Sequence, residues 1–274
     1  MTVLYENDET VTFDGTTEAT LPSTAGVAAQ GVRIDVNELS RRVRVRNRGE
    51  LTLLDAVSFT LSAGELVAIV GPSGAGKTTL LEAIAGIAPV TSGSVRFDGI
   101  DLHANLGTFR SVLGYVPQDD IIHADLPLLR TLRYAARLRL PSSTSATEID
   151  DAVRDAIDAV GLTEFTRIRA GELPYGRKRA LEIATTLALE PEMMLLDEPT
   201  AGMTHEDVER IAALIRKVAA NRTVLMVEHN LSVVSTLADR ITVLARGEIL
   251  AEGDYAAVSQ HPEVITAYLG AGHA

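Results

Sequence analysis

The chain has no cysteine and no tryptophan, and only 4% of its residues are aromatic. The absence of cysteine excludes disulfides, thiol catalysis and cysteine-based zinc sites, and it suits a reducing compartment. The low aromatic content weighs against a surface that stacks bases or sugar rings. Hydrophobic residues nevertheless make up 46% of the chain, which is enough for a well-buried core. The composition therefore predicts a globular protein stabilised by packing and not by cross-links.

The sequence also lacks a long basic run and a long apolar run. Its formal net charge of -12 repels a phosphate backbone, so we expect no nucleic acid among its partners. No stretch of about 18 residues is continuously apolar. The acidic, polar start at Met1–Thr10 has no basic segment followed by an apolar one. The sequence thus predicts neither a spanning helix nor a secretory signal, and a cytoplasmic location is the simplest expectation.

A length of 274 residues fits one large domain, or a core domain with an inserted lobe. Residues 1–31 are rich in Thr, Ala, Gly and acidic residues. They predict a tail or linker, with the last strands of a small β domain as the alternative. We expect the first part of a core at 32–118, a helical lobe at 119–172 and the second part of the core at 173–274.

Strand-like and helix-like patterns alternate along the chain. Val32–Val36 and Val57–Leu61 alternate apolar with polar residues, and Leu66–Val70 is continuously apolar, as in a strand buried on both faces. Further strands are predicted at 94–97, 112–116, 193–196, 223–227 and 241–244, and helices at 77–85, 128–140, 149–160, 208–218 and 231–237. This alternation predicts an α/β fold with a mostly parallel sheet covered on both faces.

A glycine-rich segment follows the apolar run at 66–70 and matches the pattern G-x-x-x-x-G-K-[ST]. Its residues are Gly71, Pro72, Ser73, Gly74, Ala75, Gly76, Lys77, Thr78 and Thr79. Glycines let several backbone N–H groups face one phosphate, and the N-terminus of the next helix adds positive charge. We expect Lys77 to reach the β- and γ-phosphates of ATP and Thr78 to bind Mg²⁺. Chance would produce the pattern in about one per cent of such chains, so a ligand-free glycine turn is the weaker alternative.

A second apolar strand ends in two acidic residues, Asp197 and Glu198. The carboxyl edge of a parallel sheet also carries the phosphate loop, so these carboxylates should lie beside Lys77. We expect Asp197 to hold Mg²⁺ and Glu198 to polarise the water that attacks the γ-phosphate. A helix cap or a solvated turn is the alternative for such a pair taken alone. No His, Asp and Glu cluster has transition-metal spacing, so Mg²⁺ is the only metal predicted.

Together with further motifs, these two resemble the ATP-binding cassette (ABC) ATPases, and the resemblance covers about Val32 to Gly270. Leu195–Thr200 resembles the Walker B motif of the family, Tyr115–Gln118 its Q-loop, and Val227–His229 its switch histidine. The resemblance implies that Gln118 contacts Mg²⁺ and the attacking water, and that His229 touches the γ-phosphate. Taken alone, either residue would more often be an ordinary surface residue.

Leu173–Arg177 lies where the family has its signature sequence, usually Leu-Ser-Gly-Gly-Gln, which caps the ATP held by a second subunit. The resemblance assigns Pro174, Tyr175 and Gly176 to this contact. It implies a P-loop NTPase fold with a RecA-like, mostly parallel sheet, a small antiparallel β subdomain and an inserted α-helical lobe. It also implies the partners, a second ATP-binding subunit (identical or not) and transmembrane permease subunits. These partners would hold the chain at the inner face of the cell membrane.

Three positions depart from the family pattern. Pro174 replaces a serine whose hydroxyl contacts the γ-phosphate, although the fixed φ of proline suits a first helical position. Losing such a donor typically lowers the rate by about 10²–10³, so we hypothesise that the protein binds ATP well but hydrolyses it slowly. Residues 39–43 contain no aromatic residue to stack on adenine, so Val43 or Arg41 would cover the ring. Thr204 replaces a common aspartate, which puts communication between two sites in question.

The leading interpretation is an ATPase subunit that dimerises on ATP and drives a transporter. Gly114–Pro141 is similar to G-subfamily half-transporters, whereas the chain from Leu173 onwards is more similar to ATPases of branched-chain amino acid importers. We favour the second similarity because it covers more motifs. One alternative is a regulatory module with little turnover because of Pro174. The other is a soluble ABC ATPase acting on nucleic acid or ribosomes, which the single phosphate loop and the charge of -12 disfavour. The absence of an Asn-Lys-x-Asp motif disfavours a GTPase.

Overall fold

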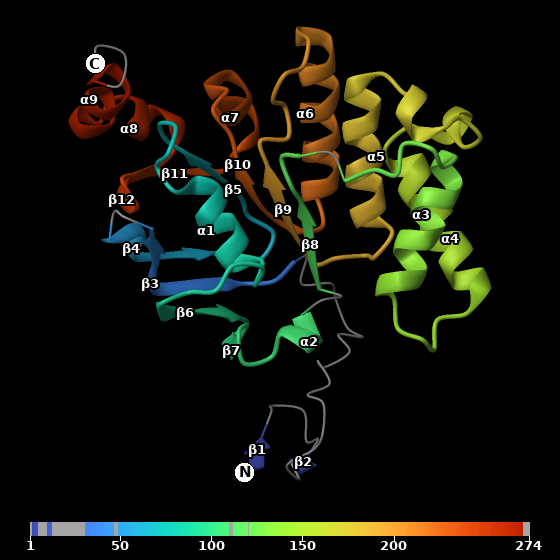
Figure 1. The fold of residues 1–274 in the computed structure, drawn as a ribbon, viewed down its shortest axis with the longest axis horizontal. Helices are drawn as coiled ribbons and strands as arrows, with labels where there is room; N and C mark the ends of the chain where they lie inside the picture. The colour runs from blue at the N-terminus through green and yellow to red at the C-terminus, as the bar shows by residue number, and fades with distance from the viewer. Residues whose placement is uncertain are drawn as a thin grey trace.

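The computed structural model of the chain describes residues 2–4, 10–12, 31–46, 49–109, 112–119 and 121–270 (Figure 1). Near the N-terminus, the short strands β1 (Thr2–Leu4) and β2 (Thr10–Thr12) pair antiparallel. Most of the predicted tail at 1–31 lies outside the described residues, so the choice between a tail and the end of a β domain stays a prediction.

The main sheet has six strands in the described part of the chain. Their order is β12 (Glu248–Gly253), β11 (Arg240–Ala245), β5 (Leu66–Val70), β10 (Thr223–Val227), β9 (Met193–Asp197) and β8 (Leu113–Val116). β8, β9, β10, β5 and β11 run parallel, and β12 pairs antiparallel with β11. The central strands β5, β9 and β10 are buried along their whole length, as their continuous apolar runs predict.

Alternate side chains of these strands enter two hydrophobic cores. Ala68 and Val70 of β5 belong to the core that includes α5 (Tyr175–Leu187), α6 (His205–Ala219) and α7 (Leu231–Leu237). Val67 and Ile69 belong to the core beneath α1 (Lys77–Ile84) and a second sheet. That antiparallel sheet has the order β4 (Gly49–Leu61), β3 (Ile34–Val45), β6 (Ser92–Phe97) and β7 (Ile100–Asp101). Both faces of the main sheet are covered, which is why its central strands β5, β9 and β10 are apolar along nearly their whole length.

The helical middle of the chain forms a lobe at one end of the main sheet (Figure 1). It contains α3 (Leu128–Arg139), α4 (Ala146–Ala159) and the short 3-10 helices η1 (Thr163–Phe165) and η2 (Ala170–Glu172). Ser145 and Glu148 form a capping box that starts α4. The buried faces of α3 and α4 join the core of α5, so the lobe is attached through the helix that the signature segment begins.

The smaller elements complete the surface around the two sheets. They are α2 (Leu106–Phe109), α8 (Tyr255–Ser259) and α9 (Pro262–Gly270). Across the described residues, none of the helices combines the length and hydrophobicity that crossing a bilayer requires.

The predicted fold class is confirmed, because the structure has a mostly parallel α/β core, an antiparallel sheet and a helical lobe. The predicted strands at 32–36 and 57–61 were too short. β3 and β4 pair over most of their length, but their register shifts at several points between Val36 and Arg42, and such bulges break the alternation that sequence reading relies on. β12 was not predicted, since it is a partly exposed edge strand with no clear alternation.

Candidate functional site

Four predicted motifs meet at one edge of the main sheet. β5 leads into Gly71, β8 into Pro117, β9 ends at Asp197, and β10 leads into Glu228. These strands are parallel neighbours, so their carboxyl ends lie together even though the motifs are far apart in the sequence. This edge is where α/β sheets of this kind bind ligands.

The phosphate loop connects β5 with α1 in a turn that only glycine permits at two points. Gly71 has φ 154°, and a Cβ there would lie 2.0 Å from the carbonyl oxygen of Leu244. Gly76 has φ 101°, and a Cβ there would lie 2.7 Å from the carbonyl oxygen of Leu53. Gly76 is the N-cap of α1, whose first turn has no acidic residue. The exposed N–H groups and the helix dipole therefore favour an anion at this point.

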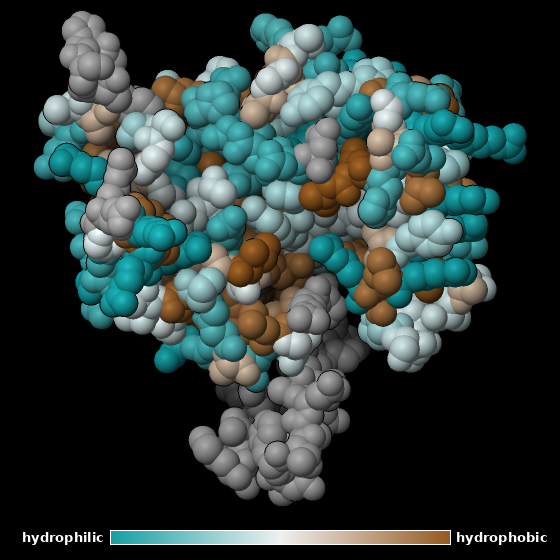
Figure 2. Space-filling view, in the orientation of Figure 1, coloured by the Kyte–Doolittle hydropathy of each residue, from teal (hydrophilic) through white to brown (hydrophobic). Residues whose placement is uncertain are grey.

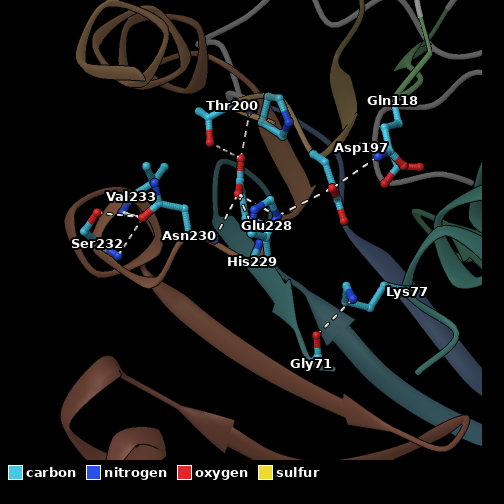
Figure 3. Close-up of polar contacts among 12 residues, drawn as sticks. Gly71, Lys77, Gln118, Asp197, Thr200, Glu228, His229, Asn230, Ser232 and Val233 are labelled. Carbon is cyan, nitrogen blue, oxygen red and sulfur yellow. Dashed lines mark hydrogen bonds and ion pairs between the residues drawn. The ribbon is translucent and has the colours of Figure 1, made fainter. Parts of the chain in front are cut away.

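The Lys77 side chain lies against its own loop. Its Nζ donates to the carbonyl oxygens of Gly71 at 2.9 Å and Pro72 at 3.1 Å. Burial lowers the pKa of Lys77, while the carboxylates of Glu198 and Asp197 act in the opposite direction. Figure 3 shows the contact between Lys77 and Gly71. The ammonium group thus stands at the centre of the loop, held by acceptors that a phosphate oxygen could replace.

The other residues of the loop divide by exposure. Ser73, Gly74 and Thr78 are exposed, Thr79 is half-buried on α1, and Ala75 is buried. The exposed positions leave backbone and hydroxyl groups open to a ligand, as the motif requires.

Asp197 and Thr78 form the pair predicted to hold magnesium. Thr78 Oγ1 donates a hydrogen bond of 3.3 Å to Asp197 Oδ1. The other carboxylate oxygen, Asp197 Oδ2, is buried and has no hydrogen-bond partner among the described residues. Burial raises the pKa of Asp197 to about 6. A buried carboxylate with an unsatisfied oxygen beside a threonine hydroxyl is a donor set that fits Mg²⁺.

Gln118 and His229 both contact Glu198. Gln118 Nε2 donates to Glu198 Oε2 at 3.3 Å, and His229 Nδ1 lies 3.5 Å from the same oxygen. The His229 side chain is 59% exposed and that of Glu198 is 20% exposed, so the cluster faces the open side of the sheet edge. The structure therefore brings together the three residues that the sequence proposed as catalytic, next to Asp197 (Figure 3).

The signature segment lies apart from this cluster. Pro174 has an extended ψ of 152° and is the N-cap of α5. It therefore lies one residue before the first helical position that the sequence predicted for it. Tyr175 is 43% exposed. Gly176 is buried, and a Cβ there would lie 2.5 Å from the Asp207 carboxylate. Within the described residues, no hydrogen bond joins positions 174–176 to the phosphate loop, which is compatible with a role at another subunit.

The two residues proposed to cover adenine differ in their surroundings. Arg41 forms an ion pair with Glu82 of α1 at 3.5 Å, and its side chain is 19% exposed. Val43 is half-buried and pairs with Leu51 on β4. Thr204, the third departure, is the N-cap of α6 and accepts a hydrogen bond from Asp207. The hydroxyl at position 204 therefore has a structural use that the sequence did not indicate.

Sequence reading missed two buried charged residues behind the site, Arg179 and Glu182 of α5. The guanidinium of Arg179 donates to the carbonyl oxygens of Pro117 at 2.7 Å and Asp197 at 2.7 Å, and it pairs with Glu182 at 2.7 Å. Glu182 also accepts from the N–H of Ile121. The pair joins the Q-loop segment to the end of β9. The only sequence signal was two charges on the apolar face of a helix.

The sequence also gave no indication of a role for a third buried charged residue, Glu228. Glu228 is fully buried and directly follows the end of β10.

Across the residues that the structure describes, no group of three or more His, Cys, Asp or Glu side chains could hold a metal ion.

The fold and this site define a P-loop nucleotide-binding protein, with a glycine-rich phosphate loop, a buried carboxylate and a glutamate at one sheet edge. The family described as ABC transporter matches residues 54–201, more than half of the chain, and the chain therefore belongs to that family. The family described as branched-chain amino acid ATP-binding cassette transporter matches residues 248–274. The resemblance inferred from the motifs is thus confirmed.

Two relatives differ in how much of them the chain covers. The ABC transporter ATP-binding/permease protein Rv1747 of Mycobacterium tuberculosis is 36% identical over 200 residues, which cover 73% of this chain and 23% of that protein. The high-affinity branched-chain amino acid transport ATP-binding protein BraF of Pseudomonas aeruginosa is 32% identical over 238 residues, covering 81% of this chain and 93% of that protein. The chain thus spans less than a quarter of the first relative and nearly all of the second.

Solved structures agree on the fold. The chain superposes on cbiO1 from Clostridium perfringens, part of the ABC transporter complex cbiONQ, with a TM-score of 0.73 and 26% identity over 85% of this chain and 92% of that one. The ADP conformation of MJ1267, an ATP-binding cassette of an ABC transporter, gives a TM-score of 0.75 at 24% identity over 87% of this chain and 99% of that one.

Proposed function

We propose that this chain is the ATP-hydrolysing subunit of an ABC transporter, working as a dimer that drives a separate membrane partner. One observation carries the proposal. Lys77 and Thr78, at the start of α1, lie beside Asp197 and Glu198, at the end of β9, along the carboxyl edge of the sheet. The hydrogen bond from Thr78 to Asp197 joins the two pairs. This combination supplies an anion site, a metal site and a base for water.

Binding begins with an exchange of acceptors at Lys77. In the structure its Nζ donates to the carbonyl oxygens of Gly71 and Pro72. The β- and γ-phosphates of ATP would replace these acceptors with stronger, charged ones. Backbone N–H groups from Gly74 onwards and the N-terminus of α1 would donate to the remaining phosphate oxygens.

Thr78 and Asp197 would hold Mg²⁺ beside the phosphates, with Gln118 as a further oxygen donor. Magnesium, when bound, offsets part of the negative charge on the triphosphate. Asp197 must be ionised for this purpose, and a bound cation would satisfy the oxygen Oδ2 that now has no partner among the described residues. The Thr78–Asp197 hydrogen bond keeps both groups ready at one point.

Glu198 is placed to act as the general base. Its carboxylate would accept a proton from a water molecule whose oxygen attacks the γ-phosphorus. The bond from the γ-phosphorus to the bridging oxygen breaks, and ADP leaves with that oxygen while inorganic phosphate forms. Gln118 and His229, which both contact Glu198 Oε2, would orient the carboxylate and the water.

An apolar groove gives the membrane partner a place to dock. It has a volume of about 730 Å³ and lies between the end of α1, α2 and the end of α3. Ile87 is 58% exposed and Leu138 is 85% exposed at its rim. Figure 2 shows hydrophobic residues exposed near the middle of this face, on the α1–α2 side and on the α3 side. Because Leu113 and Tyr115 of β8 line the groove, a docked segment would contact the strand that leads to Gln118.

The substrate class follows from the relatives. The match of residues 248–274 to the branched-chain amino acid family, and the coverage of nearly the whole length of BraF, support amino acid import. Association with the inner face of the membrane would follow from the permease contact and not from the chain itself.

The test is a comparison of purified wild type with Lys77→Ala. We expect the wild type to bind and hydrolyse Mg-ATP, and the variant to lose at least about tenfold in nucleotide affinity, because a charge-assisted contact to phosphate is removed. Lys217→Ala is the matched control, since Lys217 is an exposed lysine on α6 whose Nζ donates only to the carbonyl oxygen of Ala159. A wild type that binds no Mg-ATP, or a Lys77→Ala protein that binds it equally well, contradicts the proposal.

A further inference from the structure

Glu228 is a buried carboxylate that the proposed mechanism does not use. Its exposure is 0%, and it follows β10 directly, one residue before His229. Its oxygen Oε1 accepts hydrogen bonds from the N–H of Thr200 at 2.9 Å and from the Thr200 hydroxyl at 2.5 Å. Its oxygen Oε2 accepts from the N–H of His229 at 3.0 Å and of Asn230 at 3.2 Å. Four donors thus converge on one side chain (Figure 3).

These donors suit a carboxylate and no other side chain of this size. An ionised carboxylate accepts up to about four hydrogen bonds and donates none. Removing it from water is costly unless those bonds are made, so a buried glutamate with four partners has a specific task. A glutamine would keep the shape but would turn an NH₂ group toward backbone N–H donors that need an acceptor.

The two bonds from Thr200 join the Glu228 side chain to the loop that carries Glu198. The two bonds from the N–H groups of His229 and Asn230 fix the same side chain to its own loop. Thr200 lies two residues after Glu198, on the loop that follows β9. His229 is the second residue of the loop that follows β10, and Asn230 caps α7 by accepting from the N–H groups of Ser232 and Val233. The Glu198 carboxylate and the His229 imidazole, one from each loop, are 3.5 Å apart.

Among the residues that the structure describes, backbone hydrogen bonds join these two loops only at their start. The N–H of Glu198 donates to the carbonyl oxygen of Val227 at 2.9 Å, which continues the β9–β10 ladder by one step. Beyond that point the strands diverge into their loops, and the Glu228 side chain supplies the connection. Its removal would therefore leave the sheet intact but free His229 to move relative to Glu198.

We propose that Glu228 is a positioning residue for ATP hydrolysis, which sets His229 against Glu198 by tying the His229 loop to Thr200. It contacts neither nucleotide nor water itself. This inference rests on the proposed ATPase function. It predicts that Glu228 affects the rate of the chemical step and leaves nucleotide binding at Lys77 unchanged, because a misplacement of about 1 Å at a catalytic group can cost about 10² in rate.

The first experiment measures steady-state hydrolysis and Mg-ATP affinity of Glu228→Gln. We expect kcat to fall by about tenfold to a hundredfold, while KM and the affinity for Mg-ATP stay within about twofold. Glu65→Gln is the matched control. Glu65 is a half-buried glutamate that pairs with Arg240 at 2.8 Å just before β5 begins, at the opposite end of that strand from the phosphate loop. If kcat of Glu65→Gln falls by the same factor, the loss reflects a general disturbance of the fold and the inference is overturned.

A double-mutant cycle then tests the route through His229. If Glu228 acts by positioning His229, Glu228→Gln should reduce kcat by less than about threefold when His229→Ala is already present. If the reductions in kcat caused by Glu228→Gln and His229→Ala multiply in the double variant, the inference is overturned. Should Glu228→Gln fail to fold, Thr200→Val takes its place, because it removes one donor from Glu228 without changing the charge. Thr200→Val is expected to lower kcat and Thr200→Ser to restore it, and a Thr200→Val protein with wild-type kcat overturns the inference.

The two proposals fail in different ways. A wild type without hydrolysis, or hydrolysis that survives Lys77→Ala, overturns both. Hydrolysis that requires Lys77 but is unchanged by Glu228→Gln overturns the inference about Glu228 alone.

Discussion

The hydroxyl of Thr78 and the carboxylate of Asp197 meet through a hydrogen bond of 3.3 Å, although 119 positions separate them in the sequence. Thr78 is the second residue of α1 and Asp197 ends β9, so this contact joins the phosphate loop to the acidic end of a strand that lies two places from β5 in the sheet. The second carboxylate oxygen of Asp197 is buried without a partner among the described residues. Without a bound cation, this buried and unsatisfied oxygen should lower the stability of the fold.

Asp197→Asn should stabilise the metal-free protein at alkaline pH. Burial raises the pKa of Asp197 from 3.8 to about 6, so the folded state binds this proton more tightly than the unfolded state does. The ionised carboxylate therefore destabilises the fold increasingly as the pH rises from about 4 to about 6, and fully above that range. The full shift corresponds to at most about 3 kcal/mol.

Thermal unfolding without Mg²⁺ measures this effect. At pH 8 the variant should melt higher than the wild type, and the difference should shrink toward pH 5. Asp155→Asn, at an exposed position of α4, should leave the melting temperature unchanged at both pH values. A gain for Asp197→Asn that is equal at both pH values would refute the explanation.

Glu198→Gln should block turnover and keep nucleotide binding. The amide cannot take a proton from water, and loss of a general base typically costs about 10²–10⁴ in rate. The contacts of Gly71, Lys77 and Thr78 do not involve Glu198, so the affinity for Mg-ATP should stay close to that of the wild type. Phosphate release and equilibrium binding of a fluorescent ATP analogue measure the two quantities.

The control for this variant is Glu206→Gln, an exposed position of α6 that pairs with Arg210. It should hydrolyse ATP at the wild-type rate. If Glu198→Gln also does so, Glu198 is not the base.

Pro174→Ser should raise turnover by about tenfold or more. Pro174 is the N-cap of α5 and offers no side-chain hydrogen bond. Serine supplies a hydroxyl at a helix N-terminus, where one donor to a developing anion is typically worth about 10²–10³ in rate. The same hydroxyl can cap the helix, which adds about 1 kcal/mol of stability.

Pro174→Ala separates these effects, because it removes the proline ring and adds no hydroxyl. Its turnover should stay at the wild-type level, as measured by phosphate release at saturating ATP. If serine brings no gain over alanine, the missing hydroxyl does not limit the rate.

Leu138→Glu should release the chain from its membrane partner without affecting ATP binding. Leu138 is 85% exposed at the rim of the groove, and a charge there opposes burial against an apolar partner segment. In cells of the native host, the variant should move from the membrane fraction to the supernatant. Leu231→Glu, at a 40% exposed leucine on α7, should stay with the membranes. A Leu138→Glu protein that stays membrane-bound would place the interface elsewhere.

Local patterns were sufficient to predict most of the fold and the meeting of the predicted site motifs at one edge of the sheet. The G-x-x-x-x-G-K-T segment needs glycine at Gly71 and Gly76 for reasons of backbone geometry, and a buried strand that ends in Asp197 can be recognised from its apolar run. Strand ends in a parallel sheet meet at one edge, so the proximity of these motifs followed from the predicted topology. Where bulges shift the register, as between β3 and β4, the same reasoning predicted strands that were too short.

The sequence by itself determined the family, the phosphate loop and the acidic strand end, because each depends on residue types at close spacing. Only the tertiary structure decided what Arg179, Glu182 and Glu228 do. Their partners are backbone groups of Pro117, Asp197, Thr200 and other residues that become neighbours only when the strands assemble. A backbone carbonyl or N–H is the same in every residue, so no sequence pattern shows which one a buried charge will bind.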